Sequence, residues 1–479
     1  MLRKCTAAAL ALLLLLSVSV CAEEPYRNYT YSSSGKIYNE PQAYYAGDVI
    51  LGSALGIGDF KGPEDVFAAP DGQIYIADTD NNRIVVLNAD YTLARVIDRF
   101  QNDGQTDSFS APAGIFVTEE QVLYVADSKN KRIVVLNADG TLRQLVGEPA
   151  FDVDEQFVYE PVRIAVDHAG RMFIVSKNVN FGMIELNRDG SFSSFFGAIE
   201  VKANIGDALW RRIATESQRA KMQQNVPTEY SSNAIDKDGF VYGTISTSSI
   251  TLRVKKQNAQ GTDVLRRNGA TDPVGDMTDI DENNQVVASS LVDICVADDQ
   301  VYSILDAYRG RIFTYDNDGN LMYVFGALGN RRGCLRQPSA LDITADHTYL
   351  VADSGAGKIV CFYPTEYAQK INRAVKLQYE RDYENARAQW MEMLKYSANN
   401  EMAFNQIGEA YYRQEAYAEA LKYFKLAKNQ RQYSKAFKEL RREFMNRSFS
   451  GIMTGLVVLT VLLVGLSVWR RRKRKGREE

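Results

Sequence analysis

The chain has 479 residues, a length typical of about three domains. It carries 56 Lys and Arg against 60 Asp and Glu, and the acidic excess is concentrated in residues 23–365. That region lacks the basic surface that binding to nucleic-acid phosphates requires. With 45% hydrophobic residues and only 11 Pro, the composition excludes global disorder. The two histidines, His168 and His347, exclude a metal site built from several histidines.

The first 22 residues have the pattern of a secretory signal peptide. Two cations precede an apolar run from Ala7 to Val20, and an acidic, Tyr-rich stretch follows. Cleavage after Ala22 would leave small residues at the positions that such signals require. A lipoprotein signal centred on Cys21 is the alternative, although Val20 stands where such signals usually carry Gly, Ala or Ser. Residues 23–43 are expected to be a linker.

Six related segments follow, and each has the pattern of one blade of a β-propeller. The copies begin at Gly62, Ala111, Glu160, Tyr230, Ser290 and Gln337. Each contains three or four short β-rich runs, separated by tight turns such as PDG, KDG and NADG. Four strands per copy and a period of roughly 40 to 60 residues predict a mainly β fold, a six-bladed propeller over residues 44–365.

The sixth copy lacks a fourth strand, because the chain becomes helical after Phe362. The sequence before the first copy supplies the missing run. DVILGSALGIGDFKGPEDV, from Asp48, parallels YVFGALGNRRGCLRQPSAL, from Tyr323. We therefore expect residues near 45–52 to complete blade six and to close the ring, which leaves no open sheet edge.

The shared pattern combines a Pro, a hydrophobic strand, a D-x-x-G turn, the run [LIV]-Y-[IV]-A-D and a following N-x-R, and it resembles the NHL repeat. The match is strong in copies one and two, fair in five and six, and poor in three and four, where Ser176 and Phe181 replace the motif Asp and Arg. Four pairs of motif residues are expected to brace the turn between the second and third strands: Asp78 with Arg83, Asp127 with Arg132, Asp306 with Arg311, and Asp353 with Lys358.

Residues 366–447 change to a helical pattern. Gly408, Ala420 and Phe424 have the spacing of a tetratricopeptide repeat, and an earlier degenerate copy uses Ala386 and Trp390. Small residues at 408 and 420 allow two helices to approach closely. Because fewer than three such repeats rarely fold alone, we expect these helices to pack on the propeller or a second protomer, or to continue into the membrane helix, and to offer a surface for a membrane partner.

Residues 449–469 are uncharged and long enough to cross ~30 Å of hydrocarbon as a helix. Seven cations in residues 470–479 exceed the four that precede the span, so the tail is expected to be cytoplasmic and the preceding domains extracytoplasmic. With the leader, this predicts a single-pass protein of the cell membrane. Gly451 and Gly455 form a GxxxG pattern, which allows a homodimer.

No cofactor or metal is predicted. The chain has no Walker loop, nucleophile elbow or HExxH motif. Both histidines fall at turns between first and second strands, which sets aside the NHL-type amidating lyases and their histidine-bound zinc. Of the three cysteines beyond the leader, Cys295 and Cys361 are expected at hydrophobic strand positions, and at most one disulfide can form.

One set of aligned positions lies near the start of each innermost strand: Asp65, Gly114, Arg163, Ser232, Asp293 and Ala340. Asp65, Arg163 and Asp293 fall on alternate blades, so they can meet around the axis. Resemblance to six-bladed lactonases and strictosidine synthases implies a metal or a catalytic site in this region. The cation opposes a divalent metal and favours a small anionic or polar ligand, or a water-filled channel with compensating charges.

The links between successive blades are long and emerge on one face, which favours binding there. We call this the link face; its long links are Arg99 to Ser110, Glu148 to Glu160, Ala198 to Glu229, Ala270 to Ser289, and Ala327 to Gln337. Six residues are expected to cluster there above blades three and four: Phe151, Phe157, Tyr159, Trp210, Arg211 and Tyr230. Exposed aromatics with Arg favour contact with a protein or a glycan. The alternative is that Trp210 only pins the longest link onto the propeller.

We favour a non-catalytic, membrane-anchored binding or scaffold protein that uses the link face to bind a protein or a glycan. Resemblance to bacterial membrane-anchored NHL-repeat proteins implies an association with carbohydrate uptake systems. The alternative is a lactonase-like hydrolase or a lyase that acts at the channel mouth through Asp65 and Asp293.

Overall fold

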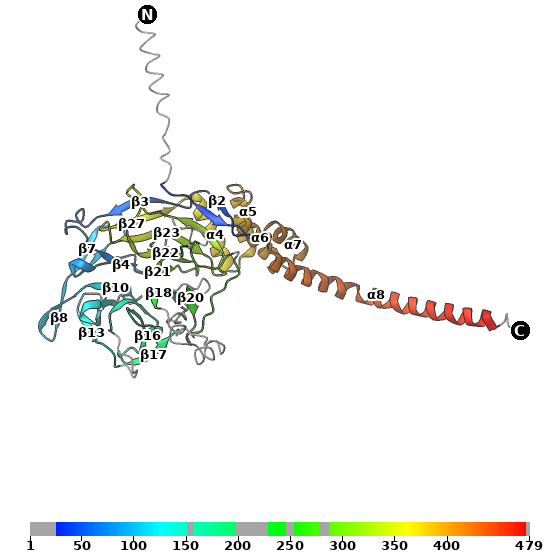
Figure 1. Cartoon of the computed structure of the whole chain (residues 1–479), viewed down its shortest axis with the longest axis horizontal. Helices are drawn as coiled ribbons and strands as arrows, with labels where there is room; N and C mark the ends of the chain where they lie inside the picture. The colour runs from blue at the N-terminus through cyan, green and yellow to red at the C-terminus, as the bar shows by residue number, and fades with distance from the viewer. Residues whose placement is uncertain are drawn as a thin grey trace, which may run out of the picture. The chain divides into compact units, whose positions relative to one another are not determined.

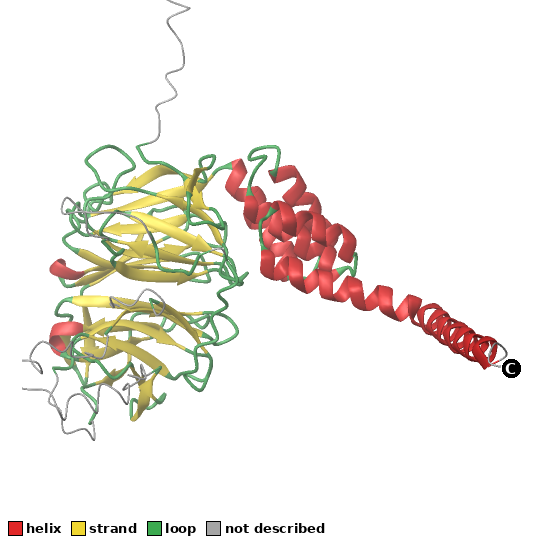
Figure 2. Ribbon diagram, turned by 45° about the vertical axis from the view of Figure 1, so that its right-hand side comes forward, coloured by secondary structure: helices red, strands yellow, loops and turns green. Residues whose placement is uncertain are grey.

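The computed structural model describes residues 25–150, 158–197, 229–245, 253–269, 271–276 and 287–475. The chain divides into two units, Met1–Gln369 and Lys370–Glu479. The first is a six-bladed β-propeller and the second is helical (Figures 1 and 2), as the sequence predicts.

Each blade is an antiparallel sheet whose strands run in chain order from the axis outward. Blades one to three have four strands each: β4 (Pro63–Ala68), β5 (Ile74–Asp78), β6 (Arg83–Leu87) and β7 (Leu93–Ile97); β10 (Pro112–Val117), β11 (Leu123–Asp127), β12 (Arg132–Leu136) and β13 (Leu142–Val146); β14 (Pro161–Val166), β15 (Met172–Ser176), β16 (Met183–Leu186) and β17 (Phe192–Phe196). Innermost strands of successive blades are neighbours, and β25 of blade six is next to β4, so the ring is closed.

The remaining blades depart from this regularity. Blade four has β18 (Tyr230–Ile235), β19 (Val241–Ile245) and β20 (Val254–Gln257), and in the described part of the chain a single bridge from Gln257 to Asp263 stands where the fourth strand belongs. Blade five has β21 (Leu291–Val296), β22 (Tyr302–Asp306), β23 (Arg311–Tyr315) and β24 (Leu321–Phe325), and blade six has β25 (Pro338–Ile343), β26 (Tyr349–Asp353), β27 (Lys358–Pro364) and β3 (Tyr44–Ile50). A two-stranded ribbon, β8 (Arg99–Asn102) and β9 (Gln105–Ser108), occupies the link between blades one and two.

The hydrophobic core lies between adjacent blades. Second strands such as β5, β15 and β22 are buried along their whole length, because a neighbouring blade covers each face. Cys295 in β21 and Cys361 in β27 occupy such buried strand positions as predicted, and they and Cys334 are free thiols.

The prediction for ring closure is confirmed. β3 pairs antiparallel with β27, with Ile50 opposite Ile359 and Tyr45 opposite Tyr363, and it becomes the outer strand of blade six. A strand from before the first blade therefore joins the last blade, which holds the two ends of the propeller sequence together.

Residues expected to be a linker instead form a hairpin on blade five. β1 (Tyr29–Tyr31) pairs with β2 (Ile37–Asn39) and, through Tyr29 and Val324, with β24, which makes a six-stranded sheet. β24 is buried throughout, whereas the outer strands β7 and β17 are largely exposed. An outer strand that is apolar on both faces needs a cover, and the hairpin supplies it.

The helical unit contains α5 (Tyr383–Met393), α6 (Glu401–Arg413), α7 (Tyr417–Leu426) and α8 (Gln430–Lys475), and α4 (Glu366–Tyr379) runs into it from the propeller unit. A Cβ at Gly408 would lie 2.7 Å from the Phe424 ring, so α6 and α7 pack closely only because residue 408 is Gly. The 46-residue α8 is long and apolar enough to cross a membrane by its length and composition.

Candidate functional site at the axis and the link face

The six aligned positions predicted from the repeats are structurally equivalent. In every blade the pairing between the innermost and the second strand shifts register after the first residue of the innermost strand. The aligned residue is the first one paired after that shift. Asp65 faces Ala77 of the second strand, Arg163 faces Val175, and Asp293 faces Leu305 at the same register. The ring thus has Asp, Gly, Arg, Ser, Asp and Ala at corresponding places around the axis.

Arg163 closes the axis at this level. Its guanidinium donates to the carbonyls of Glu64 on blade one and Ser339 on blade six, each at 3.0 Å, and to Val162 of its own strand. Its Nε lies 3.7 Å from Oδ1 of Asp293. Only 8% of Arg163 is exposed, so one side chain from blade three bridges the ring instead of lining an open channel.

The two ring carboxylates tie neighbouring blades together. Asp65 accepts from the amides of Val66 at 3.0 Å and Ile115 of blade two at 2.7 Å. Asp293 accepts from the hydroxyl of Ser232 on blade four and from the amide of Leu341 on blade six, the latter at 2.6 Å. Each carboxylate therefore acts as a connection between blades.

Burial perturbs these groups strongly. It raises the pKa of Asp65 to about 7 against the opposing effect of Arg163, and it raises the pKa of Asp293 for the same reason. Asp342, one residue further along β25 than Leu341, accepts from the amide of Ala68 at 2.7 Å, and burial raises its pKa to about 8. Burial disfavours the charge on Arg163, but Asp65 and Asp293 outweigh this effect and raise its pKa.

The metal site implied by the lactonase resemblance does not fit this arrangement. The guanidinium lies 3.7 Å from Asp293, and the oxygens of both carboxylates already accept from amides or a hydroxyl. Across the residues that the structure describes, no group of three His, Cys, Asp or Glu side chains is arranged to hold a metal ion. Asp65 and Asp293 are buried, so neither carboxylate is an exposed base.

The basic residue of the repeat motif does more than brace its turn. Arg83 pairs with Asp78 at 2.6 Å and also donates to the carbonyl of Ile57 in the preceding link. Arg132 pairs with Asp127 at 2.8 Å and with Asp107 of the link at 2.7 Å. Lys358 repeats this on blade six, 3.7 Å from Asp353 and 3.3 Å from the carbonyl of Cys334. The motif therefore fastens each of these links to its own blade.

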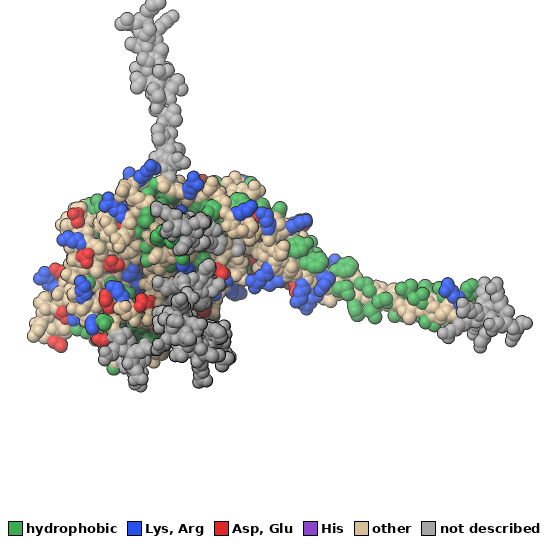
Figure 3. All heavy atoms as spheres, viewed as in Figure 1, with side chains coloured by type: hydrophobic (Ala, Val, Ile, Leu, Met, Phe, Trp, Pro, Cys, Tyr) green, Lys and Arg blue, Asp and Glu red, His purple; other side chains and the backbone are tan. Residues whose placement is uncertain are grey.

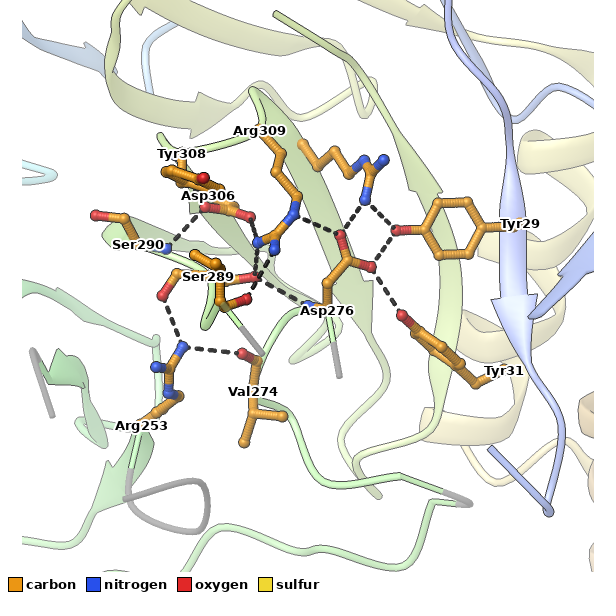
Figure 4. A network of polar contacts seen from close by, with 12 residues as sticks. Tyr29, Tyr31, Arg253, Val274, Asp276, Ser289, Ser290, Asp306, Tyr308 and Arg309 are labelled. Carbon is orange, nitrogen blue, oxygen red and sulfur yellow. Dashed lines mark hydrogen bonds and ion pairs between the residues drawn. The ribbon is translucent and has the colours of Figure 1, made fainter. Parts of the chain in front are cut away.

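On blade five the predicted side-chain pair of Asp306 with Arg311 is wrong. Asp306 pairs instead with Arg309 at 3.3 Å (Figure 4), while Arg311 binds Asp276 from the link. Arg309 also lies 3.6 Å from Asp276. The reason is that Asp276, a buried carboxylate in the link before blade five, binds the motif residue Arg311 in place of Asp306.

The same carboxylate fastens the N-terminal hairpin. Asp276 accepts from the hydroxyls of Tyr29 and Tyr31, and Figure 4 shows both rings reaching it from β1. Nearby, Arg253 donates to the carbonyl of Ser289 at 2.6 Å. Asp276 is not among the site residues that the sequence predicts, because no motif or repeat position surrounds it. The fully apolar outer strand of blade five was the available signal for the hairpin.

The predicted aromatic cluster is not an exposed group in the described part of the chain. Tyr159 and Tyr230, expected to be exposed, are buried between blades, because each lies where a link enters an innermost strand. Tyr230 donates to the carbonyl of Gly197 at 2.8 Å. Phe151, Phe157, Trp210 and Arg211 lie outside the described residues.

Other apolar side chains are exposed on the link face. Tyr308, in the turn between the second and third strands of blade five, is 52% exposed, and the Arg309 guanidinium lies 4.9 Å from its ring centre. Leu51, Val158 and Leu328, each in a different link between blades, are also exposed. The amide of Leu328 donates to the carbonyl of Arg309 at 2.9 Å, so the backbone of Leu328 runs next to the turn that carries Tyr308. We call these two exposed positions the Tyr308–Leu328 patch.

A family model described as the NHL repeat matches residues 60–87, within blade one. No curated protein matches the sequence. Solved structures with a similar fold include virginiamycin B lyase from Staphylococcus aureus (12% identity over 67% of this chain and 99% of that chain, TM-score 0.42). The WD40 propeller of Doa1 (11%, 68% and 98%, TM-score 0.40) and a protein of unknown function from Bacteroides thetaiotaomicron (12%, 71% and 76%, TM-score 0.40) are others. At these values the likeness carries no argument about activity.

Proposed function

We propose that this protein is a membrane-anchored binding or scaffold protein whose propeller binds a protein or a glycan through its link face. The observation that carries the proposal is the contrast between the two candidate sites. At the axis, Arg163 and the ring carboxylates are buried and bonded to one another or to main-chain groups. On the link face, the Tyr308–Leu328 patch is exposed and held in place by Arg309. Exposed aromatic and Arg side chains on a rigid scaffold are typical of binding surfaces.

The topology in this proposal places the propeller and the first helices outside the cytoplasm and the basic tail inside. Residues 449–469 of α8 supply the anchor, and the cationic tail sets its orientation. The helices before the anchor, with their tetratricopeptide-like spacing, contact a partner in the membrane. Components of a carbohydrate uptake system are the partners to look for first. An epitope tag after Glu479 that is protease-resistant in intact cells and cleaved after permeabilisation would support this topology.

The test of the binding face compares two exposed tyrosines of blade five. Tyr308→Ala removes the centre of the patch, and Tyr38→Ala removes a similarly exposed ring from the outermost strand of the same sheet. Full-length protein carrying each change is crosslinked in native membranes, and captured proteins are identified by mass spectrometry. The purified chain is also applied to a glycan array. We expect Tyr308→Ala alone to lose the specific partner or glycan. Equal capture by both variants would refute the assignment of this face.

A further inference from the structure

The part of α8 that precedes the membrane span carries a stripe of apolar residues. Tyr433, Phe437, Leu440 and Phe444 follow one another at intervals of four, three and four residues. At about 100° of helix rotation per residue, these four side chains lie within a sector roughly 60° wide. Lys435, Lys438 and Arg442 lie on the opposite side of the helix by the same arithmetic.

The rest of the helical unit leaves this stripe largely uncovered. Ala436, beside it, is fully buried in the cluster that α8 makes with α7. Phe437 is nevertheless 49% exposed and Phe444 is 61% exposed. The rings of Tyr433 and Phe437 lie nearly parallel, with their planes at 7° and their centres 6.5 Å apart. Together these rings form a flat apolar surface on the outside of the helix.

The same sector continues into the membrane span. Gly451, Gly455 and Val458 fall within the sector defined by the four apolar side chains, again at about 100° per residue. A Cβ placed on Gly451 or Gly455 meets nothing within 4 Å, so no other part of the described chain covers the helix backbone at these two positions. Arg447 lies about 20° outside this sector by the same arithmetic, and its guanidinium is 3.4 Å from the carboxylate of Glu443. Figure 3 shows hydrophobic side chains along this part of α8.

Lipid cannot cover the beginning of the stripe. Phe437 precedes Phe449 by 12 residues, or about 18 Å of helix. The polar headgroup layer extends only roughly 5 to 8 Å beyond the hydrocarbon on each side. Phe444 can lie in that layer, but Tyr433, Phe437 and Leu440 stand above it. Burial of these side chains therefore requires protein.

We infer that α8 is the interface of a parallel homodimer, in which the stripe of Tyr433, Phe437, Leu440, Phe444, Gly451, Gly455 and Val458 packs against the same stripe of a second copy. This inference rests on the membrane anchoring in the proposed function. Copies inserted in the same orientation hold their α8 helices parallel and at equal depth, so identical residues meet in register along the whole stripe. An unrelated helix would need a matching stripe both inside and outside the membrane.

The stripe also sets the crossing angle of the two helices. A right-handed crossing at about −40° centred on the glycines would move the two Phe437 residues apart by roughly 16 Å, 24 Å above the crossing point. A left-handed crossing near +20° moves them apart by only about 8 Å over the same distance, and supercoiling of the two helices restores contact along the stripe. The dimer is therefore expected to be a left-handed pair in which the glycines allow close approach.

Cysteine crosslinking in native membranes tests the interface at two depths. Phe437→Cys and Phe444→Cys lie on the stripe, and Lys438→Cys and Met445→Cys are controls at the same depths on other faces. The three cysteines in the described chain are buried, which keeps background crosslinking low. We expect disulfide-linked dimers from the two stripe variants and about tenfold less from the controls, the ratio that a preference of 1.4 kcal/mol produces. Equal crosslinking of all four, or none at the stripe, would overturn the inference.

A second measurement separates this inference from the proposed function. Gly451→Ile in the full-length chain should raise the dimer dissociation constant about tenfold in lipid nanodiscs, because the added side chain holds the helices apart. Met453→Ile, off the stripe, should leave it unchanged. Both variants should remain in the membrane after an alkaline wash and should retain partner capture. A chain released by the wash would refute the anchor, whereas a retained chain that is monomeric by fluorescence energy transfer would refute only the dimer.

Discussion

Replacement of Arg163 by Met tests whether the axis is held together by a buried charge network. Met fills similar space but carries no charge, so Asp65 and Asp293 lose the nearby cation, and the carbonyls of Glu64 and Ser339 lose their donor. Removal of one partner from a buried ionic network costs about 3–5 kcal/mol. The unfilled carbonyls add about 1 kcal/mol each when they find no water. We expect a loss of roughly 5–7 kcal/mol at pH 8, comparable with the lower part of the 5–15 kcal/mol typical of a domain.

The destabilisation caused by Arg163→Met should depend on pH. The pKa of Asp65 is raised to about 7 in the folded protein, above its value in the unfolded chain, so the folded state binds the extra proton. This carboxyl therefore favours folding at low pH, and the contribution is lost as the pH rises from about 4 through 7. Without Arg163 the carboxyls are still harder to ionise. The destabilisation by Arg163→Met should be smaller at pH 5, where Asp65 is protonated, than at pH 8.

The assay is urea unfolding of the full-length protein in mild detergent, followed by intrinsic fluorescence at pH 5 and pH 8. Arg99→Met is the control, because Arg99 forms an exposed pair with Asp98 at 2.9 Å, and such pairs contribute at most about 1 kcal/mol. A loss caused by Arg163→Met that is the same at both pH values would refute the coupling to the carboxylates. A loss no larger than that of the control would refute the closed axis itself.

Three further outcomes follow from the packing. Asp276→Asn weakens the buried anchor of hairpin β1–β2, so limited proteolysis should release that hairpin before it attacks the propeller, whereas simultaneous loss of both would contradict its separate attachment. Gly408→Leu places a side chain into the Phe424 ring and should destabilise the helical unit by about 1–3 kcal/mol while the propeller transition stays in place, as measured by calorimetry. Burial raises the pKa of Cys361 to about 12, and that of Cys295 also rises. Their thiols should react with Ellman's reagent only after unfolding, and reaction in the native state would show that they are accessible.

Much of the propeller could be predicted from the sequence, because its signals are local and repeated. Each blade shows its own strands and turns, so the period and the number of copies predict six blades, and the missing fourth strand of the last copy predicts the pairing of β3 with β27. The equivalence of Asp65, Arg163 and Asp293 also follows from alignment of the copies.

Contacts between distant parts of the chain depend on the closed ring. The carbonyls that bind Arg163 belong to residues 99 and 176 positions away, and Asp276 binds Tyr29 across 247 positions. No local pattern shows that a side chain fills the axis, or that a link carboxylate captures a motif Arg and an N-terminal hairpin. The sequence by itself determines the blades, because strand period and turn residues are properties of short segments. Only the tertiary structure decides which charges meet, because closure of the ring sets the distances between blades.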